Sequence, residues 1–126
     1  MYSPKKPRKK SWSEDKKLKI IIVGCGKVGS TLIEQLASEG HDITVIDKNH
    51  EIIQEMTNLY DVMGIVGNGA SYSVQTEAGI ENTDLIIAVT QSDELNLLCC
   101  TIAKRVGNCA AIARVRNPEY NKEMGY

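Results

Sequence analysis

The chain has 126 residues, of which 42% are hydrophobic and 25% charged, and its formal net charge at pH 7 is −1. This length supports one domain with an apolar core and excludes a large multidomain enzyme. No run approaches the roughly 20 consecutive apolar residues of a membrane span, and the N-terminus lacks the apolar stretch of a secretory signal, so we expect a cytoplasmic chain.

The first 17 residues differ in charge from the rest. Residues 1–17 carry seven lysines and arginines against Glu14 and Asp15, a net charge of +5, so the remaining residues carry −6. With two prolines, three serines and almost nothing to bury, we expect this basic leader to be disordered. Contact with anionic lipid or nucleic acid is the alternative. The acidic remainder argues against a nucleic-acid-binding domain.

Short runs rich in Ile and Val alternate with longer segments of helical period from Lys19 onward. This alternation predicts a parallel sheet. The runs are nearly continuous in apolar residues, as strands buried on both faces are. The expected strands are 19–24, 42–47, 62–66, 85–89 and 110–115.

Apolar stripes between these runs predict helices that cover the sheet. The stripes consist of Val28, Leu32, Leu36 and Ala37; Ile52, Ile53, Met56 and Leu59; and Leu95, Leu98, Ile102 and Val106. A weaker helix is expected over 74–78. Asn49 and Ser92 are the expected N-caps, and Gly40 and Gly107 lie where C-caps are expected.

This order of elements predicts a single α/β domain, residues 18–126, with a Rossmann-like doubly wound parallel sheet of strand order 3-2-1-4-5. The chain direction across the sheet reverses between strands 1 and 4. Ligands of such folds bind at the carboxyl ends of the strands near this point. We therefore expect the ligand site to lie near Gly24, Asp47, Gly67 and Thr90.

A glycine motif, Gly24-Cys25-Gly26-Lys27-Val28-Gly29, joins the first expected strand to the first helix. Gly24 permits the tight turn, Gly26 lets the backbone approach a pyrophosphate, and Gly29 lets the helix pack close to the sheet. The free N–H groups of the helix start would meet the phosphates. The alternative is a glycine turn that only closes a βα unit.

An acidic residue, Asp47, ends the second expected strand 23 residues after Gly24. A carboxylate here can accept hydrogen bonds from the adenosine ribose hydroxyls, and it repels a 2′-phosphate. NAD or an adenine nucleotide is therefore favoured over NADP, although the adjacent Lys48 weakens that preference. Capping of the following helix is the alternative role of Asp47.

Three further positions fall at the ends of the later strands. In the turn Gly67-Asn68-Gly69-Ala70, small residues leave space for a purine, and Asn68 offers an amide to a base edge; an ordinary turn is the alternative. Thr90 is expected to face the cleft. Arg114 could bind phosphate or an acidic partner, or form a surface ion pair instead.

Residues 19–126 resemble the TrkA-N domain, also called the RCK or KTN domain, of potassium uptake systems and potassium channels. The resemblance is carried by the glycine motif, Asp47, the Gly-Asn-Gly turn and the segments 77–80, 84–90, 92–96 and 113–120. It implies nucleotide contacts at Gly24, Cys25, Gly26, Lys27, Val28, Gly29, Asp47, Lys48, Asn68, Gly69, Thr90 and Arg114.

The resemblance also implies a function. We expect NAD or NADH, or alternatively ATP, ADP or AMP, to bind in a regulatory subunit that controls a membrane-embedded potassium transporter or channel. Such a subunit would form a homo-oligomer at the inner face of the membrane, held there by its partner. Many family members have Asp where Asn68 stands, a difference that bears on the ligand preference at the adenine side. The chain also stops shortly after the fifth expected strand, so we expect a piece of a longer protein.

Two enzyme classes begin with a similar glycine loop. A cofactor-binding fragment of an NAD-dependent oxidoreductase is the main alternative, and a methyltransferase that uses S-adenosylmethionine is another. The sequence shows no proton-transfer pair for the former, and His41 and His50 are expected to be exposed. The methyltransferase would need further strands. We therefore expect a ligand-binding regulatory domain and no enzyme activity.

Overall fold

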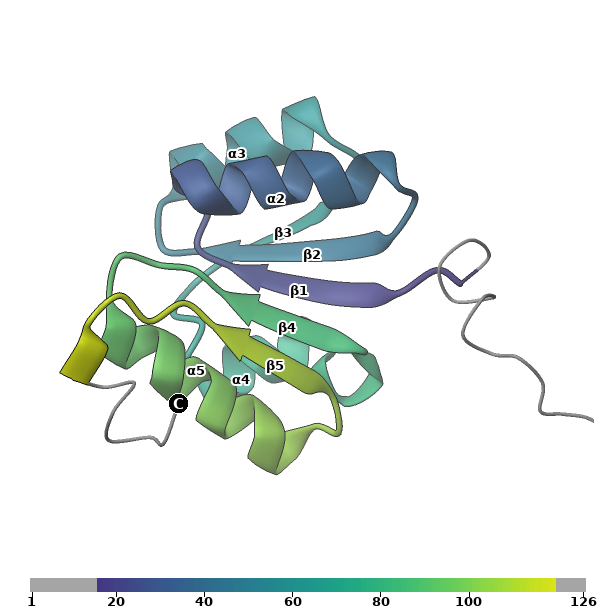
Figure 1. Cartoon of the computed structure of the whole chain (residues 1–126). Helices are drawn as coiled ribbons and strands as arrows, with labels where there is room; N and C mark the ends of the chain where they lie inside the picture. The colour runs from purple at the N-terminus through teal and green to yellow at the C-terminus, as the bar shows by residue number, and fades with distance from the viewer. Residues whose placement is uncertain (1–15, 120–126) are drawn as a thin grey trace, which may run out of the picture.

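Five short strands form one parallel sheet in the computed structural model, which describes residues 16–119 (Figure 1). Their order is β3-β2-β1-β4-β5, as predicted. Val23 of β1 lies level with Ile46 of β2 and with Ala88 of β4. The carboxyl ends of the three central strands therefore meet at one edge. The strands are β1 (Lys19–Val23), β2 (Asp42–Asp47), β3 (Met63–Val66), β4 (Leu85–Ala88) and β5 (Ala110–Ala113).

Helices cover both faces of the sheet (Figure 1). One face carries α2 (Lys27–Ser38) and α3 (His50–Leu59). The other carries α4 (Tyr72–Glu77), the 3₁₀ turn η1 (Ile80–Asn82) and α5 (Asp93–Val106). This three-layer arrangement follows from right-handed crossovers that reverse direction between β1 and β4.

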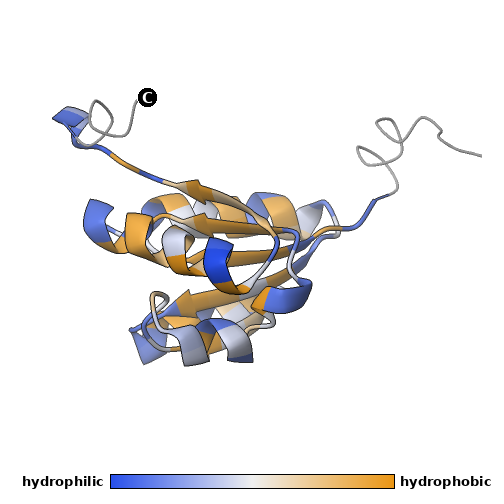
Figure 2. Cartoon of the chain, turned by 90° about the horizontal axis from the view of Figure 1, so that it is seen from below, coloured by the Kyte–Doolittle hydropathy of each residue, from blue (hydrophilic) through white to orange (hydrophobic). Residues whose placement is uncertain are grey.

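Alternate residues of the strands pack against opposite helical layers. Ile20 and Ile22 of β1 join the core under α2 and α3, whereas Ile21 and Val23 join the core under α4 and α5. Successive side chains of a strand point to opposite faces, so a strand with apolar residues at every position supplies both cores. Figure 2 shows the hydrophobic strands inside and hydrophilic residues on the outer turns.

Two details of the expected packing are wrong. Leu59 and Leu98, placed on core-facing stripes, are exposed, as is Val28 to a smaller extent. The buried face of α5 consists instead of Asn96, Cys99, Cys100 and Ala103. The edge strands are also not buried throughout, because each has a neighbour on one side only within the described residues: Met63, Val66 and Ile112 are exposed.

The expected N-caps are confirmed. Asn49 accepts hydrogen bonds from the N–H groups of Glu51 and Ile52, and Ser92 accepts one from Leu95. Gly107 is the C-cap of α5, whereas Glu39 is the C-cap of α2 and Gly40 follows it with φ +86°. The weaker helix begins at Tyr72, two residues before the expected start, because Ser71 caps it.

None of the helices within residues 16–119 combines the length and apolarity that crossing a membrane would require. Residues 1–15 of the expected basic leader lie outside the described part of the chain. Lys16 and Lys17, its last residues, are exposed and belong to no helix or strand.

Candidate functional site

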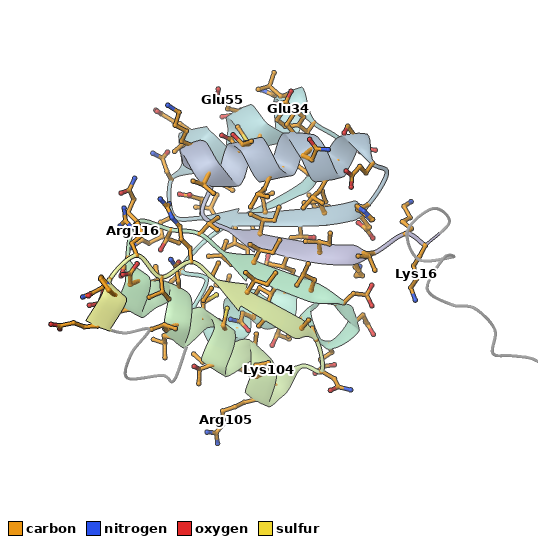
Figure 3. All side chains as sticks on the ribbon, in the orientation of Figure 1. Lys16, Glu34, Glu55, Lys104, Arg105 and Arg116 are labelled. Atoms are coloured by element: carbon orange, nitrogen blue, oxygen red, sulfur yellow. The ribbon has the colours of Figure 1, made fainter. Side chains whose placement is uncertain are left out.

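A cavity of about 450 Å³ opens at the carboxyl edge of the sheet. Its walls come from the ends of β1, β2 and β4, the start of α2, and the loops that follow β3 and β5. Figure 3 shows Arg116, one of the lining residues, at this edge and Lys16 at the opposite one. The cavity thus lies where the strand order predicts a ligand site.

The N-terminus of α2 forms one wall of the cavity. Its N-cap is Gly26, which has no side chain to accept hydrogen bonds, and its first turn contains no acidic residue. The first N–H groups of a helix have no partners within the helix, and the helix dipole adds positive potential there. In α3, α4 and α5 a side chain caps this position. The start of α2 is therefore suited to an external anion.

The three glycines of the motif have different structural roles. Gly24 has a φ of +102°, and a Cβ there would lie 2.9 Å from the backbone nitrogen of Thr90. A Cβ on Gly29 would lie 1.8 Å from the carbonyl oxygen of Gly24, so α2 can approach β1 only without a side chain there. A Cβ on Gly26 would meet nothing within 4 Å among the described residues. Of these three positions, the first two serve the fold and the third leaves space at the cavity.

Asp47 joins β2 to the glycine loop. Its Oδ2 accepts a hydrogen bond of 2.9 Å from the Cys25 N–H, and its Oδ1 accepts one of 2.8 Å from the Asn49 N–H. A carboxylate has about four acceptor positions, so both oxygens can accept further bonds from a ligand. Asp47 is not itself the N-cap of α3, but it binds the N–H group of the N-cap residue, Asn49, and so supports the start of this helix. Both roles are compatible.

The cavity lining is mainly basic among its charged residues. The lining holds one carboxylate, Asp47, and four basic residues, Lys27, Lys48, Arg114 and Arg116. Within residues 16–119 only Arg116 of these four forms an ion pair, with its Nε 3.8 Å from Oδ1 of Asp93. The acidic body therefore concentrates positive charge at this cavity, which favours a ligand with more than one negative charge.

A buried amide holds the end of β4. Oδ1 of Asn96 accepts hydrogen bonds from the Thr90 N–H at 2.9 Å and from the Thr90 hydroxyl at 2.7 Å. Its Nδ2 donates to the carbonyl oxygens of Thr90 and Arg114. The side chain of Asn96 is fully buried. It therefore fixes two lining residues, one after β4 and one after β5.

A carboxylate at the start of α5 holds the segment after β5. Asp93 accepts hydrogen bonds from the N–H groups of Arg116 and Asn117, at 2.8 to 3.1 Å. These backbone bonds, from Arg116 first, lower the pKa of Asp93, and the guanidinium charges of Arg116 and Arg114 add to the effect. The carboxylate is consequently charged at neutral pH, and it orients Arg116 at the cavity.

The cysteine thiols do not take part in the cavity surface. Cys25 is buried, and burial together with the nearby Asp47 carboxylate raises the pKa of its thiol to about 12. Burial also raises the pKa of Cys99 to about 12 and that of Cys100 to about 11. Thiols with such pKa values stay protonated at neutral pH and are poor nucleophiles.

Nine of the twelve residues expected to contact a nucleotide line the cavity. The exceptions are Cys25, Gly29 and Asn68. The Cys25 N–H is already bound to Asp47, and Gly29 is covered by the Gly24 carbonyl group. Asn68 closes its own turn, since its Oδ1 accepts a hydrogen bond from the Ala70 N–H at 2.9 Å. The oxygen of Asn68 thus closes an ordinary turn, and the contact of its amide group with a base edge stays a prediction.

Sequence reasoning missed several residues of this region. Arg116 lines the cavity, and its position two residues after Arg114 could have indicated it, since such residues share a side of an extended chain. Ile52 and Leu95 supply apolar parts of the lining. The histidines lie elsewhere: His50 is exposed, and half-buried His41 accepts a hydrogen bond from Leu18 N–H, so it is less exposed than expected.

Residues 20–125 match the sequence profile of the TrkA-N domain. The chain belongs to the TrkA-N domain family. It is 40% identical over 107 residues to the Trk system potassium uptake protein TrkA of Vibrio alginolyticus, a match that covers 84% of this chain and 23% of the relative. It is 43% identical over 103 residues to a Trk system potassium uptake protein TrkA homolog of Archaeoglobus fulgidus, covering 82% and 23%. This TrkA-N chain thus spans less than a quarter of these relatives.

Solved structures share the fold of this TrkA-N domain. The GsuK channel bound to NAD aligns with a TM-score of 0.75 at 21% identity, over 89% of this chain and 20% of that chain. The AMP-bound Kef C-terminal domain of Shewanella denitrificans aligns with a TM-score of 0.73 at 17% identity, over 85% and 67%. The NAD(P)-binding domain of an exopolyphosphatase-related protein from Archaeoglobus fulgidus gives 0.75 at 21% identity, over 86% and 81%. The Rossmann-like fold is confirmed.

Proposed function

We propose that this TrkA-N domain binds NAD or NADH, or an adenine nucleotide, in the cavity at the carboxyl edge, and that occupancy regulates potassium uptake. The observation that supports this most directly is the start of α2. Its N-cap, Gly26, has no side chain and faces open space, while Lys27, Arg114 and Arg116 line the same cavity. A pyrophosphate would find N–H donors and cations there together.

The adenosine end of the ligand is assigned to the other side of the cavity. Asp47 has acceptor capacity left for ribose hydroxyls, and its two backbone hydrogen bonds hold the carboxylate in place. Ile52 and Val28 supply apolar surface nearby for a purine ring. The names of the relatives, Trk system potassium uptake proteins, and the NAD-bound and AMP-bound structural neighbours support this assignment.

The regulated partner is a membrane-embedded potassium transporter or channel subunit. The domain acts as a sensor in a homo-oligomer, without turnover of the nucleotide and without binding nucleic acid. Regulation requires only that the ligand binds one conformation of the assembly more tightly than another. In this role the chain lies in the cytoplasm, and its partner holds it at the inner face of the membrane.

The test is calorimetric titration of the purified chain with NAD, NADH, ATP, ADP, AMP and S-adenosylmethionine. The test variant is Gly26→Val, whose side chain would enter the space at the start of α2. The matched control is Ser38→Val, the introduction of the same side chain at the other end of this helix. We expect the wild type and Ser38→Val to bind a nicotinamide or adenine nucleotide and Gly26→Val to lose it. Binding of S-adenosylmethionine alone would refute the proposal.

A further inference from the structure

Asn96 connects two strand ends that the sheet itself leaves separate. The ladder between β4 and β5 ends at Ala88 and Ala113, followed by one hydrogen bond from the Arg114 N–H to the Ala88 carbonyl oxygen. Beyond that point, the Asn96 amide donates to the carbonyl oxygens of both Thr90 and Arg114, at 3.1 and 2.9 Å. The two residues at the cavity therefore share one buried carboxamide.

All of the hydrogen-bonding groups of this carboxamide are used. Its Oδ1 accepts from the N–H and the hydroxyl of Thr90, and its Nδ2 donates twice. An apolar side chain here would leave buried backbone groups without partners, which is costly. Because the amide is planar and fully buried, a shift of Thr90 must move either the amide or its bond to Arg114.

Asp93 extends the connection along the chain. It lies three residues before Asn96 on α5, and its carboxylate accepts the N–H groups of Arg116 and Asn117. Residues three apart on a helix share a face. Two side chains in the first turn of α5 thus hold the segment that follows β5: Asn96 binds Arg114, and Asp93 binds Arg116 and Asn117. Asn96 also binds Thr90, at the end of β4.

We propose that Asn96 is a positioning residue that couples occupancy of the cavity to the segment 114–119, an inference that rests on the proposed function. A nucleotide in contact with the Thr90 hydroxyl or the Arg114 guanidinium restrains a residue to which Asn96 is hydrogen-bonded, through the hydroxyl of Thr90 or the backbone carbonyl group of Arg114. The amide then holds the Arg114 carbonyl oxygen, and Asp93 holds the residues that follow. Coupling is reciprocal, so whatever fixes this segment also raises nucleotide affinity.

The experiment measures hydrogen exchange of the Arg116 and Asn117 amides with and without saturating AMP or NAD. The test variant is Asn96→Asp, which keeps the side-chain shape and an oxygen for the Thr90 N–H but, as a carboxylate, donates to neither carbonyl oxygen. The matched control is Asn108→Asp, the same change at an exposed position beyond the far end of α5. Calorimetry on each protein establishes binding independently.

In the wild type and in Asn108→Asp we expect the ligand to slow exchange of both amides by about tenfold, within the usual range of coupling between sites. In Asn96→Asp we expect the ligand still to bind, but the slowing to fall below about twofold. Faster exchange in Asn96→Asp with the ligand effect retained would indicate a merely structural role and overturn the inference.

Failure of the inference and failure of the proposed function give different results. If the wild type binds no nucleotide, the proposed function fails and the inference fails with it. If the wild type binds without any change at Arg116 and Asn117, only the coupling fails. If Asn96→Asp does not fold, as judged by circular dichroism, Asn96→Ser removes the amide with a smaller side chain, and the same loss of the ligand effect is expected.

Discussion

The backbone N–H of Cys25 donates a hydrogen bond of 2.9 Å to Oδ2 of Asp47, and this bond joins the turn after β1 to the end of β2. The other oxygen of Asp47 accepts the Asn49 N–H at the start of α3. One carboxylate therefore sets the position of two loops at the cavity while it keeps acceptor capacity for a ligand. Its loss should affect both folding and binding.

The first prediction concerns Asp47→Ala. We expect the affinity for NAD or AMP to fall by about 1 to 3 kcal/mol, because charge-assisted hydrogen bonds to the ribose are lost, and thermal stability to fall as two backbone donors lose their partner. Titration calorimetry and thermal unfolding measure the two effects. Asp61→Ala, at an exposed position after α3, is the control and should change neither. Unchanged affinity in Asp47→Ala would remove this residue from the site.

The second prediction separates two glycines of the same loop. Gly29→Ala should unfold the domain or lower its melting temperature severely, because the new Cβ would lie 1.8 Å from the Gly24 carbonyl oxygen. Gly26→Ala should leave the melting temperature nearly unchanged, because its Cβ has no neighbour within 4 Å among the described residues. Thermal unfolding followed by circular dichroism measures both. Equal melting temperatures for the two variants would contradict this assignment of roles.

The strand order could be predicted from the sequence because the pattern of apolar runs on which it depends is clear. Continuous Ile and Val runs mark the buried strands, and alternation with helices leaves few topologies. The buried face of α5 could not be predicted in the same way. Its residues Asn96, Cys99 and Cys100 do not form an apolar stripe, whereas the more apolar Leu98 points outward. A buried polar residue becomes recognisable only when its partners are known.

In the candidate site, too, some features could be predicted from the sequence and others could not. Positions defined by backbone geometry, such as Gly24 and Gly26, follow from the motif and its place between a strand and a helix. Side-chain roles depend on local competition for hydrogen bonds, and the Ala70 N–H takes up the oxygen of Asn68. The contact of the Asn68 amide group with a base edge stays a prediction, because only its oxygen is engaged in the turn. The expected fifth strand ran to residue 115, whereas β5 ends at Ala113 and Arg116 lies in the segment beyond it.

The third prediction is a pH dependence that comes from Asp93. Backbone hydrogen bonds from Arg116 and Asn117 lower its pKa below 3.8. A carboxyl group with a lowered pKa in the folded state adds stability above its unfolded pKa and loses it as pH falls through the folded pKa. The difference in melting temperature between wild type and Asp93→Asn should be constant above about pH 5 and should shrink below about pH 4.

The fourth prediction concerns the buried thiols. Burial raises the pKa of Cys25 and Cys99 to about 12 and that of Cys100 to about 11. Because the folded pKa lies above the unfolded value of 9.0, the stabilisation is complete below pH 9 and is lost as pH rises toward the folded values. Iodoacetamide at pH 8 should label these residues far more slowly in the native chain than in denaturant, as mass spectrometry of peptides can show. Native labelling at the rate of a free thiol would contradict their burial.

The last prediction is binding of a nicotinamide nucleotide without turnover. The cavity contains N–H donors, cations and Asp47, but neither histidine of the chain lines it, and the described cysteines are buried with raised pKa values. Hydride transfer to a carbonyl compound would need a proton donor held within hydrogen-bond reach of the substrate, and among the described residues no hydrogen bond or ion pair orients the ammonium groups of Lys27 or Lys48, the two lysines of the lining. Asp47 is engaged by the N–H groups of Cys25 and Asn49, so it is suited to holding a ribose.

Incubation of the chain with NADH and a panel of carbonyl compounds tests this prediction. We expect absorbance of the reduced nicotinamide to stay constant at concentrations where calorimetry shows saturation, and Gly26→Val to lose binding with no change in absorbance. Oxidation of NADH that depends on the protein and disappears in Arg114→Ala or Thr90→Val would overturn the sensor in favour of an oxidoreductase. If NADH saturates the protein and is not oxidised, the result supports regulation, in which the nucleotide acts by binding one conformation more tightly than another.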